Sequence, residues 1–169
     1  FLLLLITILS SSYSQQSSDI IQRTCENTKY YDLCVSSLIS DASTEHQTDP
    51  KGLALIILDL ARANATATNS YLTSQMSSNF TAKAAVGVMK ECRDRYGYAV
   101  EALANGARDV AAELYDLAYL HVMAAADYPT GCRFAFRRYG GIVYPGELAT
   151  RENQLRQICD VAMEIIDGL

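Results

Sequence analysis

The chain has 169 residues and a net charge of -5, and half of its residues are apolar. That length suits a single domain with a substantial core, and the apolar fraction excludes a disordered chain. Because phosphate binding needs a concentrated basic surface, the acidic charge argues against nucleic acid as a partner.

The N-terminal stretch is typical of a signal peptide. Residues 1–9 form an apolar run, and small polar residues from Ser10 to Ser14 follow it at once. The run is shorter than the ~20 apolar residues that span a bilayer, so we expect no membrane association. We therefore expect residues 1–14 to be a signal peptide, truncated at its start. The protein is then secreted to the apoplast, with the vacuole as the other destination.

Helical periodicity dominates the rest of the chain, and strand patterns are nearly absent. The first stripe of core-facing residues is predicted to contain Leu53, Ile57, Leu60, Asn64, Ala67 and Tyr71. Three further stripes run from Ala85 to Val110, from Tyr115 to Phe136 and from Leu155 to Ile166. Alternating steps of three and four residues keep one helix face toward a bundle axis, so the pattern predicts an all-α bundle.

Breaks between these helices are predicted from turn residues. Ser77 to Asn79 separate the first two helices, and Gly140 to Gly146 separate the last two. Thr150 is the expected N-cap of the final helix. Pro129 and Gly131 are expected to interrupt the third helix and kink it.

The chain has five cysteines, so one thiol is expected to stay free. Cys92 and Cys132 both lie on core stripes, and a disulfide between them needs Cα atoms within roughly 7 Å. On antiparallel helices that bond would place the reversal at residues 111–114. A turn at Asn105-Gly106 would instead misalign the two cysteines by ~18 Å. Gly106 is then a small residue that lets two helices approach closely.

The other three cysteines are Cys25, Cys34 and Cys159. A continuous helix would hold Cys25 and Cys34 about 13 Å apart, so a bond between them requires the segment to fold back. Cys159 lies on the core face of the last helix, where a buried, inert thiol is expected.

No motif points to catalysis, a metal or a cofactor. The chain lacks a nucleophile elbow, a P-loop and a zinc-protease motif, and His46 and His121 lie far apart. We therefore expect a protein that is not an enzyme. Two glycosylation sequons start at Asn64 and Asn79, of which Asn79 is the better acceptor because it lies in a predicted break.

Several segments resemble the plant invertase and pectin methylesterase inhibitor family, particularly its pollen branch. They are Cys25 to Cys34 with Ser37-Leu38, Gly52 to Ile57, Cys92 with Tyr96 and Ala99, Tyr115 with Ala118 and Cys132, and Gly141 to Asn153. The resemblance implies an up-down-up-down four-helix bundle over 49–169, an N-terminal helical hairpin over 15–48, and Cys25–Cys34 and Cys92–Cys132 disulfides. It also implies an inhibitor that occludes an extracellular pectin methylesterase or acid invertase in a one-to-one complex. The alternative is a helical carrier of a small molecule.

The chain departs from that family in the turn between the second and third long helices. Well-characterised invertase inhibitors are similar there but carry Pro-Lys-Phe, whereas this chain reads Glu113-Leu114-Tyr115. The basic residue is missing, and Glu113 is expected to repel the carboxylates of an invertase active site. Restoring Pro-Lys-Phe at these three positions is expected to strengthen invertase inhibition.

Overall fold

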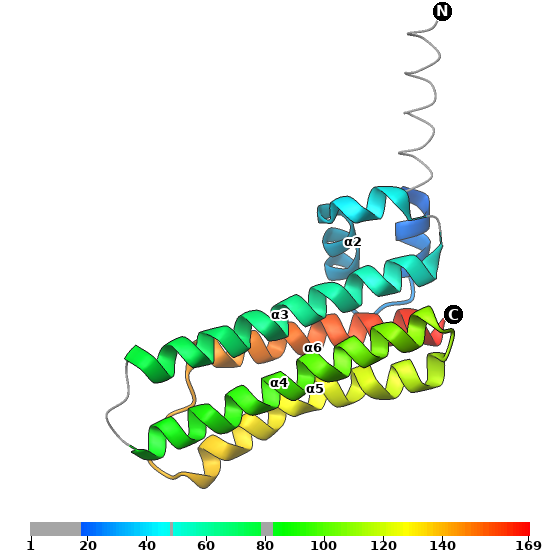
Figure 1. Ribbon diagram of the computed structural model, residues 1–169. Coiled ribbons are helices and arrows are strands. Elements are labelled where there is room, and N and C mark those ends of the chain that lie inside the picture. Colours follow the sequence, from blue (N-terminus) through cyan, green and yellow to red (C-terminus); the bar gives the residue numbers. More distant parts are fainter. Residues whose placement is uncertain (1–17, 48, 79–82) are drawn as a thin grey trace, which may run out of the picture.

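The computed structural model describes residues 18–47, 49–78 and 83–169, and the regular elements of this part of the chain are all helices (Figure 1). The expected signal peptide lies outside the described residues. A helix over 18–25 is followed by α2 (Tyr31–Ser40), the 3-10 helix η1 (Ala42–His46), α3 (Pro50–Ser78), α4 (Lys83–Ala111), α5 (Tyr115–Arg138) and α6 (Gly146–Asp167). Helices α3 to α6 form the expected four-helix bundle, and the helix over 18–25 pairs with α2 as the N-terminal hairpin.

The core follows the predicted stripes on α4, α5 and α6, but the stripe on α3 is shifted. All the predicted core positions of α4 are buried, from Ala85 to Val110. On α3 the prediction is right at Leu53 and Ile57 and wrong beyond them. The buried positions there are Ala61, Ala65, Thr68 and Leu72, each one residue after the predicted one. Small alanines fill this face because the neighbouring helices pack closely against it.

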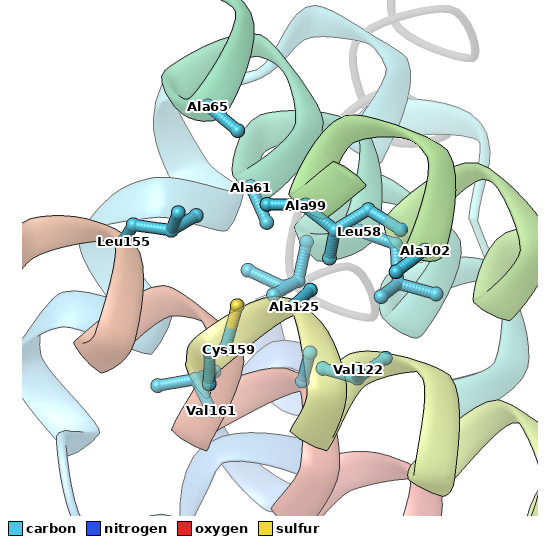
Figure 2. Close-up of a cluster of buried hydrophobic side chains, with 14 of the residues drawn as sticks. Leu58, Ala61, Ala65, Ala99, Ala102, Val122, Ala125, Leu155, Cys159 and Val161 are labelled. Carbon is cyan, nitrogen blue, oxygen red and sulfur yellow. The ribbon is translucent and has the colours of Figure 1, made fainter. Parts of the chain in front are cut away.

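Figure 2 shows this small-residue interior. Ala61 and Ala65 of α3 and Ala99 of α4 lie in one cluster with Ala125 of α5 and Leu155 of α6, all fully buried. Cys159 belongs to the same cluster, and its thiol is free, as expected. Burial raises the pKa of the Cys159 thiol to about 12, so it stays protonated and unreactive at neutral pH.

Two disulfides have the expected pairing. Cys92 and Cys132 join α4 to α5 with their Cα atoms 4.5 Å apart, and Cys25 joins Cys34 across the N-terminal hairpin. The reversal between α4 and α5 lies after Ala111 and before Tyr115, where the disulfide geometry places it. A Cβ added at Gly106 would lie 3.2 Å from a methyl of Val122, so this glycine does allow α4 and α5 to approach closely.

Two local predictions about helix ends are wrong, and so is the predicted interruption of α5. Ser77 and Ser78 belong to the end of α3 rather than to a break. Thr150 does not cap α6, because that helix already begins at Gly146 so that Leu148 can be buried, and the Thr150 hydroxyl donates to the Gly146 carbonyl. Helix α5 is not interrupted at Pro129, which is one of its buried residues.

The buried carboxylate of Glu152 binds residues of α5 and of the segment between α5 and α6. Glu152 is 1% exposed, and its Oε2 atom lies 2.9 Å from Nη2 of Arg133 and accepts a 2.9 Å hydrogen bond from Tyr144 Oη. Burial and the Glu152 carboxylate both raise the pKa of Tyr144 well above its usual range, so this hydroxyl stays a donor. A buried charge needs such partners, and they fix the path of the chain at this end of the bundle.

Candidate functional site: the turn between α4 and α5

The turn between α4 and α5 has a defined hydrogen-bonded geometry. Leu114 N donates to the Asp109 carbonyl at 2.9 Å, and Glu113 N donates to the Val110 carbonyl at 3.1 Å. This pattern is a Schellman motif, whose C′ residue takes a left-handed conformation and is usually glycine. Here that residue is Glu113, with a φ of 62°. Helix α4 therefore ends in a fixed shape that presents residues 112–114 at one tip of the bundle (Figure 1).

The backbone of Glu113 rules out part of the expected Pro-Lys-Phe replacement. The proline ring fixes φ near −65°, so proline cannot adopt the observed conformation at position 113. Restoring all three residues would therefore rebuild the turn rather than change its side chains. The informative substitution is at Leu114 alone.

Glu113 is paired with Lys51, a residue that the sequence did not point to. Its Oε1 atom lies 2.9 Å from Nζ of Lys51, in the first turn of α3. The hydrogen bond and the opposite charge raise the pKa of Lys51 and lower that of Glu113. The turn thus does have a cation beside it, supplied by another helix, and the Glu113 charge is offset rather than free to repel.

The other two predicted turn residues differ in exposure. Leu114 is 50% exposed and forms the apolar tip of the turn. Tyr115 begins α5 and packs partly against the core, as expected. Tyr119, one helical turn further on, is 36% exposed. The turn therefore presents one half-exposed apolar side chain, flanked in sequence by Glu113 of the ion pair and by Tyr115.

The remaining candidate residues support a structural role. His121 Nδ1 lies 2.7 Å from Asp109 Oδ2, a pair that ties α5 to α4. His46 lies in η1, on a different element. Within the described ranges there is no cluster of three or more His, Cys, Asp or Glu side chains that could hold a metal ion. None of the helices described is long and apolar enough to cross a membrane.

Of the two sequons, the structure describes the one that starts at Asn64. Asn64 lies in the middle of α3, and its buried Oδ1 atom lacks a hydrogen-bond partner among the described residues, whereas Asn79 lies outside them. In a secretory host we expect Asn79 to carry glycan and Asn64 to carry much less, because a glycan at Asn64 would oppose helix packing. Enzymatic deglycosylation in heavy-oxygen water followed by mass spectrometry measures both occupancies. Higher occupancy at Asn64 than at Asn79 would contradict this.

Comparison with known proteins gives consistent results. Residues 19–165 match the family described as plant invertase/pectin methylesterase inhibitor. The chain is 39% identical to cell wall / vacuolar inhibitor of fructosidase 2 from Arabidopsis thaliana, over 99% of this chain and 95% of that protein. It is 37% identical to pectinesterase inhibitor 28 from Oryza sativa subsp. japonica, over 89% of this chain and 69% of that protein.

Solved structures agree on the fold. A mutant form of a pectin methylesterase inhibitor from Arabidopsis superposes with a TM-score of 0.69 at 21% identity, over 86% of this chain and 93% of that one. The family match covers most of the chain, and the fold agrees with it. The chain belongs to the plant invertase/pectin methylesterase inhibitor family, whose members inhibit enzymes and are not enzymes themselves.

Proposed function

We propose that the protein is a secreted inhibitor of a plant cell-wall carbohydrate enzyme and that it blocks the active-site cleft with the turn end of its bundle. The observation that carries this is the turn itself. Leu114 projects at the tip, half exposed, on a backbone fixed by two hydrogen bonds and by the Lys51–Glu113 ion pair. A backbone that is already hydrogen-bonded loses less conformational entropy on binding than an open loop does, which favours affinity.

Acid invertase is the first candidate target. The relative named as an inhibitor of fructosidase is similar over nearly the whole of both chains, whereas the rice pectinesterase inhibitor is matched over a smaller share of its length. Pectin methylesterase is the second candidate, because the chain is nearly as similar to that relative and the fold agrees with pectin methylesterase inhibitors. In either case inhibition is reversible and one-to-one, in the cell wall or the vacuole.

Incubating the secreted protein with each purified enzyme tests the proposal. We expect activity to fall to zero near equimolar inhibitor for acid invertase, with weaker inhibition of pectin methylesterase. The control is the same protein reduced and alkylated in denaturant, which opens the buried disulfides, prevents refolding of the bundle and should abolish inhibition. No inhibition of either enzyme by the native protein would show that the proposed function is wrong.

A further inference from the structure

A groove lies beside the turn, between the start of α5 and the end of α6. It measures about 490 Å³ and is lined by four residues of α5, which are Tyr115, Asp116, Tyr119 and Leu120, and by Ile166, Asp167 and Leu169. We call it the terminal groove. Tyr115, which directly follows the turn, lines this groove, and the turn and the end of α6 lie at the same end of the bundle (Figure 1).

The terminal groove combines an apolar floor with aromatic and aliphatic walls. Ile166 is 2% exposed and forms the floor, while Tyr119 and Leu120 are exposed at the walls. Such walls accommodate the methylene stem of a long side chain, and tyrosine ring faces attract a cation. The shape therefore fits an extended side chain with a charged end.

The charged side chains that line the groove are both carboxylates. Asp116 and Asp167 are both exposed, and neither forms an ion pair with a residue that the structure describes. Lys51, a cation at this end of the bundle, already pairs with Glu113 at 2.9 Å. The whole chain carries a net charge of -5, so no overall positive field offsets these two carboxylates.

We propose that the terminal groove receives a lysine or arginine side chain of the target enzyme, an inference that rests on the proposed function. The stem of that side chain packs against Tyr119 and Leu120, and its cation lies between the carboxylates of Asp116 and Asp167. Arginine fits best, because its planar guanidinium carries several donors for carboxylates and can stack on a tyrosine ring. The groove then anchors the enzyme beside the cleft that the turn blocks.

The test compares the double variant Asp116→Asn/Asp167→Asn with wild type on the enzyme that wild type inhibits. The matched control is Asp127→Asn, because Asp127 is an exposed carboxylate on α5 outside the groove. At low salt we expect the double variant to bind about tenfold more weakly, and the difference to shrink as salt rises. Asp127→Asn should stay within about twofold of wild type. Thermal unfolding of each variant checks that the fold is kept.

The possible outcomes separate failure of the groove proposal from failure of the proposed function. If the double variant inhibits as well as wild type, or if Asp127→Asn loses as much affinity, the groove proposal is wrong while the proposed function stands. If the double variant changes the oligomeric state on size-exclusion chromatography while wild type is a dimer, a second copy occupies the groove and the proposal is again wrong. If wild type inhibits neither enzyme, the proposed function fails and this inference fails with it.

Discussion

Replacing Cys92 and Cys132 by alanine is expected to lower the free energy of unfolding by about 4 kcal/mol. The reason is that the disulfide closes a long loop and so reduces the conformational entropy of the unfolded chain. The two cysteines are 40 residues apart in sequence and both fully buried between α4 and α5. For a domain of this size the loss corresponds to a fall in Tm of about 8–16 °C. The turn should keep its geometry in the folded variant, because its hydrogen bonds are local.

Chemical denaturation of the double variant and of a matched Cys25→Ala/Cys34→Ala variant measures this effect. The shorter loop of the second pair, with a sequence separation of 9, predicts a smaller loss of about 3 kcal/mol. Removing this second disulfide is also expected to destabilise mainly the N-terminal hairpin. If removing Cys92–Cys132 changes the unfolding midpoint less than removing Cys25–Cys34, the central disulfide is not the main constraint on the bundle.

The bundle and its central reversal could be predicted from the sequence because several independent constraints agree. The stripe on α4 is regular from Ala85 to Val110, and two cysteines on facing stripes leave one position for the turn. Gly106 fits this arrangement although its neighbourhood looks like a turn. The physical reason is that disulfide distance is a stronger restraint than local turn propensity.

Other features depend on information that a residue pattern does not carry. Alternating steps of three and four residues from Ile57 fit Leu60 as well as Ala61, and the structure buries Ala61. The positive φ of Glu113 cannot be read from a residue type that seldom adopts it. Lys51 could have been found from topology, because the start of α3 and the turn after α4 lie at the same end of an up-down bundle.

Replacing Leu114 by lysine is expected to strengthen inhibition of acid invertase about tenfold or more. Glycosidases of this kind use a pair of carboxylates at the scissile bond, and a lysine at the tip of the turn can donate charge-assisted hydrogen bonds to them. Such bonds contribute about 1.5–3 kcal/mol each, and 1.4 kcal/mol corresponds to about tenfold in affinity. The substitution leaves Glu113 in its left-handed conformation and paired with Lys51.

The central claim is that the turn end of the bundle faces the enzyme, and an inhibition titration of wild type, Leu114→Lys and Val143→Lys against acid invertase tests it most directly. Val143 is 86% exposed and lies between α5 and α6, at the opposite end of the bundle, so it adds the same charge far from the turn (Figure 1). We expect Leu114→Lys to lower the inhibition constant about tenfold and Val143→Lys to leave it unchanged within about twofold. Equal changes in both variants, or a change with Val143→Lys alone, would show that the turn does not contact the active site.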